Sequence, residues 1–472
     1  MNVVLICLDT FRADCLAALG RNQVIRTPNL DALAADGIVF ENAVGEAQPT
    51  IQFRRGLATG IRAFPWRHRY DTRGLWPTPR GWHKIPPEYD TLAEVLLENG
   101  YLTGLVADTY HMFKPTQNYT RGFTSFEFVR GQESDTYRTG PLSAIDIDRY
   151  CKPGRDPHPV LVQYLLNMQD RRSEEDYLPA QVFSRATRYL ADNKDNGPFF
   201  LWIDSFDPHE PWDPPTRFAD AYDSTWTESW EPIFGWRNPD EAERRRATAL
   251  YYGECTFVDE LIGRFLGELD RLGLADDTLV AVVSDHGTEL WDHGAMGKGA
   301  HAAVHRHNTE ILCMLRYPGS AKRGARSPAL VQNHDLMPTI LGLLGIDYAP
   351  RADAELYGTE LGPLLRGEVD DVRTHAVTGG FDRVAVRSRR YSYSVQFEID
   401  DGAEFLFDLE NDPGETTNLL TNPAGRAGQP RSAHRRAAEE VLGAPIPVQL
   451  PDETKPSRPP SMEWVPSRLG RT

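Results

Sequence analysis

The sequence predicts an α/β protein with a mostly parallel central sheet, and two patterns carry this prediction. Near-continuous apolar runs alternate with amphipathic segments over the first two thirds of the chain, which is typical of buried parallel strands separated by helices. From about residue 370, short strands of alternating polarity follow one another and indicate a small antiparallel sheet. We therefore expect an α/β domain, its sheet sandwiched by helices, at residues 1–368 and a C-terminal subdomain at residues 369–472.

The expected elements of the large domain alternate along the chain. A strand at 2–9 precedes a helix at 27–37, which starts at Thr-Pro and stops at a glycine. A second helix with a glycine stop is expected at 90–100, before a strand at 101–108. The later elements are a strand at 197–207, a helix at 250–272, and strands at 277–287 and 311–319.

The C-terminal subdomain is expected to contain strands at 383–398 and 403–415, where polar and apolar residues alternate. A helix is expected at 431–443, and a Pro-rich tail ends the chain.

Composition restricts the classes of partner. A net charge of −17 disfavours nucleic acids, because phosphate backbones are bound through clustered Lys and Arg. No window approaches the roughly 18 apolar residues of a membrane span, and the first apolar run lacks the basic flank of a signal peptide. The five cysteines form no C-x-x-C pair. We expect a cytoplasmic protein that binds a small anionic molecule, with no nucleic acid and no membrane; its oligomeric state, a homo-oligomer included, stays open.

Three of the predicted strands end in polar residues that are suited to binding a cation. Asp9 follows the first strand, residues 204–209 follow a middle one, and the adjacent Asp285 and His286 follow a late one. Ligands of such sheets gather beyond the carboxyl ends of the strands, so these ends are expected to converge. An oxygen-rich set with a single imidazole suits Mg²⁺, Ca²⁺ or Mn²⁺ and is compatible with Zn²⁺.

Seven segments in a fixed order strengthen this hypothesis. They are residues 2–20, 27–44, 91–108, 205–215, 284–299, 335–346 and 406–420. Together they resemble the sulfatase family of the alkaline phosphatase superfamily. The resemblance implies an alkaline phosphatase-like α/β core, one divalent cation between the strand ends, and a nucleophile on the loop that follows the pattern F-x-N-A.

The nucleophile loop departs from the sulfatase pattern, in which Cys or Ser is followed by x-Pro-x-Arg and later by Thr-Gly. Thr50, Gln52 and Arg54 stand at the matching positions, and Thr59 and Gly60 close the loop. Sulfatases oxidise the Cys or Ser to the aldehyde formylglycine. Threonine carries a methyl group on Cβ, so the same oxidation would yield a ketone, and a formylglycine sulfatase is disfavoured.

A threonine hydroxyl can attack directly if a cation lowers its pKa. Relatives in the superfamily, such as nucleotide pyrophosphatases, use threonine in this way on phosphorus. The resemblance therefore implies that Thr50 is both nucleophile and metal ligand, together with Asp9, Asp285 and His286. Thr10 stands where sulfatases have a further aspartate ligand, as in the phosphonate monoester hydrolase branch.

The remaining candidate residues follow the family motifs. Arg54 lies one helical turn after Thr50 and is expected to hold the substrate oxyanion with forked hydrogen bonds. Lys298 matches the lysine that contacts the transferred group, and His209 matches the histidine expected to protonate the leaving group. The Gly-Lys-Trp-His pattern of sulfatases is not kept, and the expected substrate-binding residues are Asp108, Tyr110, His111 and His301.

The leading hypothesis is a metal-dependent hydrolase of phosphate diesters or phosphonate monoesters that forms a phosphothreonine intermediate. Three alternatives stay open: a sulfatase that uses unmodified threonine, a transferase of phosphoryl or phosphoryl-alcohol groups, and an inactive binding protein that retains the fold. A two-metal phosphodiesterase would need a further Asp and two His ligands, so one divalent cation is expected, with Mn²⁺, Mg²⁺, Ca²⁺ and Zn²⁺ as candidates.

Overall fold

The structure of the chain is a computed structural model. It describes residues 1–66, 81–113, 117–236, 238–298, 305–320, 322–399, 402–421 and 428–450.

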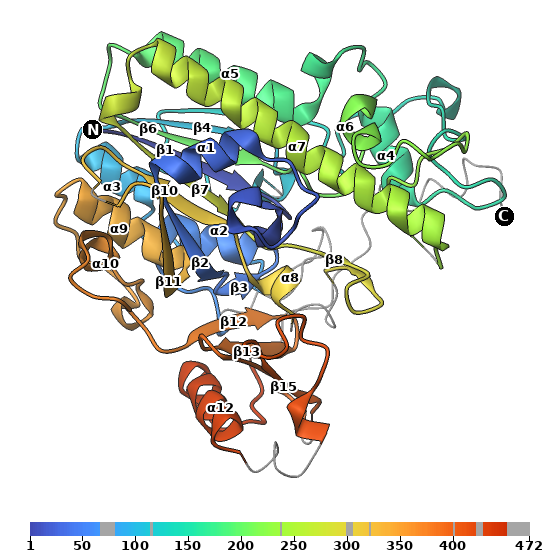
Figure 1. Ribbon diagram of the computed structural model, residues 1–472. Helices are drawn as coiled ribbons and strands as arrows, with labels where there is room; N and C mark the ends of the chain where they lie inside the picture. Colours follow the sequence, from blue (N-terminus) through green and yellow to red (C-terminus); the bar gives the residue numbers. More distant parts are fainter. Residues whose placement is uncertain are drawn as a thin grey trace.

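An eight-stranded sheet forms the centre of the molecule, in the order β11-β2-β10-β7-β1-β6-β4-β5 (Figure 1). All its neighbouring strands pair in parallel except β10, which is antiparallel to both β2 and β7. The strands are β1 (Asn2–Leu8), β2 (Ile38–Val44), β4 (Leu102–Ala107), β5 (Ser125–Phe128), β6 (Phe199–Ser205), β7 (Thr278–Ser284), β10 (Cys313–Arg316) and β11 (Ala325–Gln332). The mostly parallel sheet predicted from the sequence is confirmed.

Helices cover both faces of this sheet (Figure 1). One face packs against α1 (Pro28–Asp36), α5 (Leu178–Asn193) and α7 (Glu241–Arg271). The other packs against α2 (Thr50–Thr59), α3 (Leu92–Glu98) and α9 (Leu336–Leu343). Alternate residues of β1 enter the two cores, and this is why its apolar run has no polar positions.

Helix α7 is longer than the sequence pattern predicted. It begins nine residues before the expected start, because the side chain of Asp240 accepts a hydrogen bond from the Glu243 amide while Glu243 caps the Asp240 amide in return. The shorter elements of the chain are α4 (Pro159–Asn167), α6 (Thr216–Asp220), β8 (Glu289–Leu290), β9 (Met296–Gly297), α8 (Arg306–Thr309) and α10 (Gly362–Arg366).

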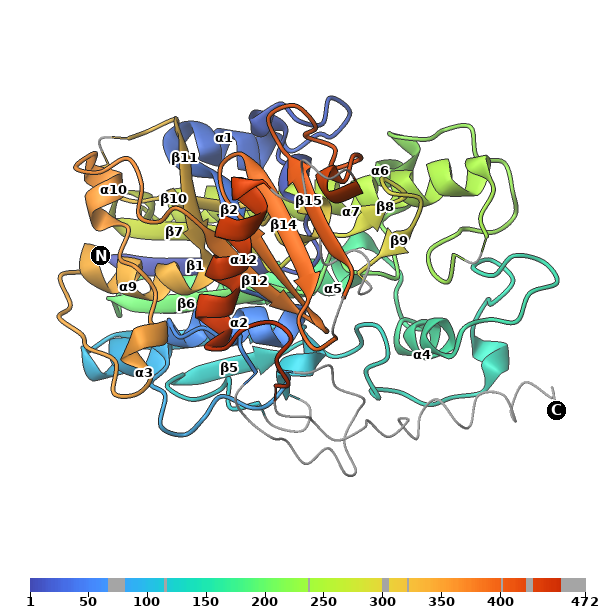
Figure 2. The same ribbon diagram turned by 90° about the horizontal axis from the view of Figure 1, so that it is seen from below.

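A second sheet lies against the lower edge of the first and has the order β15-β14-β13-β12-β3 (Figures 1 and 2). Its strands are β3 (Ala47–Gln48), β12 (Ala376–Gly380), β13 (Arg383–Arg387), β14 (Tyr391–Gln396) and β15 (Glu404–Asp408), and α12 (Gln429–Leu442) packs on it. The predicted small antiparallel sheet is thus present. The division at residue 368 stays a prediction, and the Pro-rich tail lies outside the described residues.

Strand β3 joins the two parts of the chain. It precedes Thr50 by two residues and pairs in parallel with β12, with Ala47 opposite Gly379 and Gln48 opposite Gly380. The backbone immediately before the predicted nucleophile is therefore an edge strand of the C-terminal sheet.

The cysteines are free, and four of the five are buried, with Cys151 half-buried. Within the described parts of the chain, no helix is long and apolar enough to cross a membrane.

A buried histidine makes the stability of the fold depend on pH. His334 is 4% exposed beside α9, and burial lowers the pKa of its ring to about 3. As the pH falls below about 6.5, His334 is protonated in the unfolded chain but stays neutral in the folded protein. The stability that is present above about pH 6.5 is therefore lost as the pH falls toward 3. Between pH 7.5 and pH 5 this loss is about 2 kcal/mol.

We predict that the free energy of unfolding of the His334→Gln variant falls by about 2 kcal/mol less than that of the wild type over this interval. Urea unfolding at both pH values, with a chelator present in every sample, measures the two slopes. Equal slopes would show that His334 does not resist protonation in the folded protein.

Candidate active site

Four acidic side chains lie at the carboxyl ends of four adjacent parallel strands. Asp285 directly follows β7, Asp9 follows β1, Asp204 is near the end of β6, and Asp108 follows β4. All four are fully buried. The convergence expected from the sequence is present, and Asp204 and Asp108 extend it along the same edge.

Arg54, one helical turn after the start of α2, links three of these carboxylates. Its Nη1 donates to Asp285 Oδ2 at 2.6 Å and to Asp9 Oδ2 at 3.1 Å. Its Nε faces both oxygens of Asp204, at 3.0 and 2.9 Å. The guanidinium is itself 0% exposed. Burial alone would lower the pKa of Arg54, but the carboxylates, Asp204 foremost, raise it well above its usual value.

Thr50 is the first residue of α2, so its loop leads into a helix. The residue is buried. Its backbone carbonyl accepts a hydrogen bond from Arg54 Nη1 at 3.3 Å. The same nitrogen binds Asp9 and Asp285, so one donor group connects the predicted nucleophile to two predicted metal ligands.

The residues predicted to bind a cation fit a divalent ion. His286 donates from Nδ1 to the Gly287 carbonyl at 2.8 Å, which leaves the lone pair on Nε2. This Nε2 is buried, has no hydrogen-bond partner among the described residues, and lies 3.8 Å from Asp9 Oδ1 and 3.6 Å from Asp285 Oδ2. One ligand atom from each of Asp9, Asp285 and His286 falls within 4.8 Å of the others.

Charge and protonation favour the same conclusion. Arg54 is the single Lys or Arg side chain that contacts Asp9, Asp204 and Asp285 within the described structure, so the carboxyl groups outnumber the positive charges there. Burial and the neighbouring Asp285 raise the pKa of Asp9, and burial lowers the pKa of His286 to about 4. The ring of His286 is therefore neutral at physiological pH, which is the form that binds metals.

Thr10 adopts an unusual backbone conformation beside this cluster. Its φ of 63° lies in the left-handed region, which a β-branched residue rarely adopts. In this conformation its amide donates to Asp285 Oδ1 at 2.9 Å and its hydroxyl donates to Asp9 Oδ1 at 2.8 Å. The Tyr251 hydroxyl on α7 stabilises the same turn by donating a hydrogen bond to the Thr10 carbonyl at 2.8 Å. A residue that replaces an acid thus still orients two predicted ligands.

Lys298 reaches this cluster through Thr10. Its Nζ donates to Thr10 Oγ1 at 3.0 Å and to Glu210 Oε2 at 2.7 Å. Burial would raise the pKa of Glu210, but the charges of His209 and Lys298 lower it to about 2. Lys298 therefore joins Thr10 to an ionised carboxylate that precedes α6.

His209 lies beside Glu210, with its Nδ1 2.6 Å from the Glu210 carbonyl. A carbonyl only accepts, so Nδ1 carries a hydrogen and Nε2 is the atom available to a substrate. The ring stacks on Phe206, with centroids 4.1 Å apart, and His111 lies 5.8 Å from the same Phe206 ring.

The predicted substrate-binding residues already have partners within the protein. Asp108 accepts from the Phe206 amide at 2.6 Å and from Gln132 Nε2 at 2.8 Å. Tyr110 is fully buried and donates to Glu133, and His111 Nε2 lies 3.5 Å from Glu133. Contact of these side chains with a substrate stays a prediction, and His301 lies outside the described residues.

Two residues near the site were not assigned a role from the sequence. Asp204 was noted only as the start of a polar strand end, although it holds Arg54 through two oxygens. Glu210 follows His209 directly and binds Lys298. Both acids lie in the strand-end segment that also contains His209, and pairing its acids with Arg54 and Lys298 would have suggested them. Local sequence does not show these pairs, because the partners lie 88 residues or more apart.

The fold and this edge of the sheet define an α/β protein whose buried acids and imidazole at the strand ends fit a divalent cation. The family described as Sulfatase matches residues 1–346, and the family described as N-sulphoglucosamine sulphohydrolase, C-terminal, matches residues 302–429. The chain belongs to the sulfatase family of the alkaline phosphatase superfamily, whose members are hydrolases that act on ester bonds and use a divalent metal ion.

Curated relatives cover nearly the whole chain. An arylsulfatase of Clostridium perfringens is 27% identical over 89% of this chain and 90% of its own length. The multifunctional alkaline phosphatase superfamily protein PehA of Trinickia caryophylli is 26% identical over 90% and 92%. Among solved structures, the phosphonate monoester hydrolase of Agrobacterium radiobacter is similar with a TM-score of 0.72, at 22% identity over 94% of this chain and 95% of that one. The last likeness shows the shared fold.

We predict that Asp204→Asn destabilises the protein by about 3 kcal/mol. Both Asp204 oxygens accept hydrogen bonds from buried donors on Arg54, Thr109 and Trp202, and the new amide would turn an N–H group toward one of these donors. Asp195→Asn is the matched control: its side chain is 82% exposed and pairs with Lys194 at the surface, so we expect a change below about 1 kcal/mol. Urea unfolding of the three proteins measures both effects. Equal losses in the two variants would contradict the structural role assigned to Asp204.

Proposed function

We propose that the protein hydrolyses phosphate diesters or phosphonate monoesters through Thr50. The observation that carries this proposal is that a threonine, which cannot become formylglycine, is the first residue of α2 and that its carbonyl accepts from the Arg54 nitrogen that also contacts Asp9 and Asp285. The nucleophile would then be the unmodified hydroxyl.

The proposed reaction has two steps. The Thr50 oxygen attacks phosphorus, the bond to the ester oxygen breaks, and a phosphothreonine forms while the departing oxygen takes a proton. Water then attacks the same phosphorus and the bond to the Thr50 oxygen breaks. A proton from this water restores the threonine hydroxyl. The net reaction consumes one water and yields an alcohol and an acid.

Asp9, Asp285, His286 and Thr50 would hold one divalent cation, with Mn²⁺, Mg²⁺, Ca²⁺ and Zn²⁺ as candidates. When bound, the cation would lower the pKa of the threonine hydroxyl and offset charge on the ester. Arg54 supports this arrangement because it contacts two of these acids and the Thr50 carbonyl.

Lys298 would supply a cationic group suited to the developing negative charge, and Arg54 would act through Asp9 and Asp285, which it holds. Lys298 is held between Thr10 and Glu210, so its ammonium group has a defined position before a substrate arrives. His209 presents Nε2 as the remaining ring nitrogen, and its protonated form would donate to the leaving oxygen.

A second candidate is hydrolysis of small sulfate esters by the unmodified threonine. It is supported by relatives named as sulfatases, including the arylsulfatase above and a choline-sulfatase of Rhizobium meliloti that is 26% identical over 91% of this chain and 84% of its own length. Transfer to an acceptor alcohol would follow the same first step, with the alcohol in place of water. An inactive protein is disfavoured by the retained Arg54, Lys298 and acidic set.

We predict that the wild type cleaves bis(4-nitrophenyl) phosphate and 4-nitrophenyl phenylphosphonate with a larger kcat/KM than 4-nitrophenyl sulfate, with Mn²⁺, Mg²⁺, Ca²⁺ and Zn²⁺ added in separate assays. Thr50→Ala should lower kcat by at least about 10³-fold, as expected for loss of a nucleophile, whereas Thr50→Ser keeps measurable activity. Intact-protein mass after rapid quenching should show a phosphorus adduct on the wild type and none on Thr50→Ala.

The matched control is Thr248→Ala, which removes a hydroxyl on the surface of α7 that donates to the Arg244 carbonyl of the same helix. Its activity should equal that of the wild type. A preference for the sulfate would favour the second candidate, and full activity of Thr50→Ala would exclude Thr50 as the nucleophile.

The role of His209 predicts a dependence on the leaving group. His209→Asn should reduce kcat/KM by about 10²-fold for an alkyl phosphate diester, whose leaving oxygen needs a proton, and far less for 4-nitrophenolate. Rates for a series of leaving groups, plotted against leaving-group pKa, measure this. Parallel lines for wild type and variant would assign the histidine another role.

A further inference from the structure

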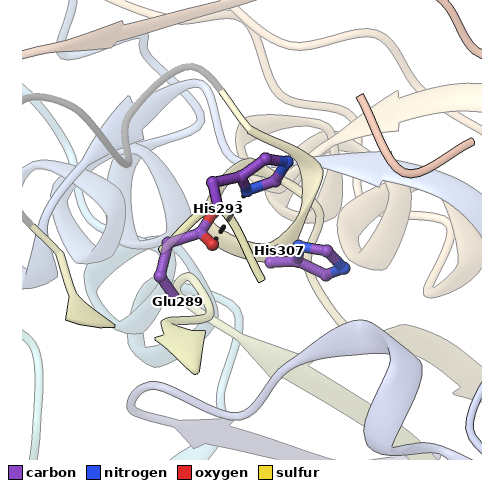
Figure 3. A group of neighbouring side chains, drawn as sticks. All are labelled: Glu289, His293 and His307. Atoms are coloured by element: carbon purple, nitrogen blue, oxygen red, sulfur yellow. Dashed lines mark hydrogen bonds and ion pairs between the residues drawn. The ribbon is translucent and has the colours of Figure 1, made fainter. Parts of the chain in front are cut away.

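A second group of possible metal ligands lies between the β8–β9 hairpin and α8 (Figure 3). Glu289 is the first residue of β8, His293 lies in the turn before β9, and His307 is in α8. One ligand atom from each falls within 4.8 Å of the others. The Glu289 side chain is 0% exposed, and the histidines are 15% and 16% exposed.

The hydrogen bonds of His293 leave a lone pair facing a carboxylate. Its Nε2 lies 2.8 Å from the Gly414 carbonyl, which only accepts, so Nε2 carries a hydrogen. In the neutral ring Nδ1 then has no hydrogen, yet it lies 2.9 Å from Glu289 Oε2. Two lone pairs at this distance repel, and a positive charge must lie between or beside them.

The other two side chains also present free ligand atoms. Within the described parts of the chain, the buried Glu289 Oε1 and the buried His307 Nδ1 have no hydrogen-bond partner. A buried polar atom without a partner is costly, and a bound ion removes that cost. The structure thus provides an unpartnered carboxylate oxygen and an unpartnered imidazole nitrogen beside the His293 lone pair.

A proton is the competing occupant. Burial would lower the pKa of His293, but its hydrogen bond to Glu289 and the charge of that carboxylate raise it to about 9. A protonated His293 would satisfy Glu289 Oε2 but would leave Glu289 Oε1 and His307 Nδ1 without partners. A metal ion can satisfy all three side chains together.

We propose that Glu289, His293 and His307 bind a zinc ion at a site distinct in its ligands from the one formed by Asp9, Asp285 and His286. Two imidazole nitrogens and one carboxylate oxygen are a ligand set typical of Zn²⁺, with a fourth position left for water. Metal-binding histidines usually donate a hydrogen bond from the ring nitrogen that does not bind the metal. His293 does this from Nε2 to the Gly414 carbonyl.

The proposed ion would fix the position of Lys298. The β8–β9 hairpin contributes Glu289 and His293, and Lys298 follows β9 directly. His307 anchors the ion to α8, and Gly414 belongs to the segment after β15. Metal binding would therefore connect the lysine-bearing hairpin to two other parts of the fold.

The test is the metal content of the full-length protein, stripped with a chelator, dialysed against Zn²⁺ and freed of excess ion. Elemental analysis should find two zinc ions in the wild type and one in each of Glu289→Gln, His307→Gln and Asp9→Asn. The combined Asp9→Asn, His307→Gln variant should bind none. His305→Gln is the matched control. The His305 ring stacks on the His293 ring, with centroids 3.5 Å apart, but His305 is not in the ligand group, so this variant should keep two zinc ions.

Cobalt provides a readout that does not depend on catalysis. Co²⁺ in place of Zn²⁺ should give visible absorption of a four-coordinate site that persists in Asp9→Asn and is lost in His307→Gln. Retention of the Asp9-dependent ion in His307→Gln shows that this variant is folded. A wild type that binds only the ion lost in Asp9→Asn would overturn the proposal and leave His293 as a protonated partner of Glu289.

Because the two ions are removed by different variants, loss of the proposed zinc site and failure of the proposed reaction are distinguishable. A protein with two ions that cleaves no phosphorus ester would retain this inference and reject the function. A protein that binds only the Asp9-dependent ion and cleaves such esters would reject this inference and retain the function.

Discussion

The burial of one guanidinium among three carboxylates is the interaction on which the site depends. Arg54 is fully buried and contacts Asp9, Asp204 and Asp285, which come from three adjacent strands. Without Arg54, these acids would be mutually repulsive in a region without solvent. With Arg54, the carboxyl groups still outnumber the guanidinium, and a bound cation would offset the excess negative charge.

Much of the fold and part of the site could be predicted from the sequence. The convergence of Asp9, Asp285 and His286 follows from the rule that parallel strands end at one edge of a sheet, so the apolar runs before them were sufficient. The position of Thr50 at a helix start followed from the family pattern. These predictions required only local sequence and strand direction.

Other features depend on contacts that local sequence does not encode. The two residues of β3 have no strand pattern of their own and become a strand only because β12 lies beside them. Glu210 acquires its role from Lys298, 88 residues away, and Asp204 acquires its role from Arg54, 150 residues away. The start of α7 was missed for a different reason, since the capping pair Asp240 and Glu243 was present in the sequence but lay outside the apolar pattern.

The pairing of β3 with β12 has a consequence for how the protein is made. A ribosome synthesises Ala47 long before Gly379, and during most of translation the backbone before Thr50 has no strand to pair with. The loop that carries the proposed nucleophile can pair with β12 only after residues 376–380 have emerged. A chain that ends before β12 would therefore carry most of the large sheet while the segment before Thr50 lacks its strand partner, so the proposed reactivity would depend on the C-terminal sheet.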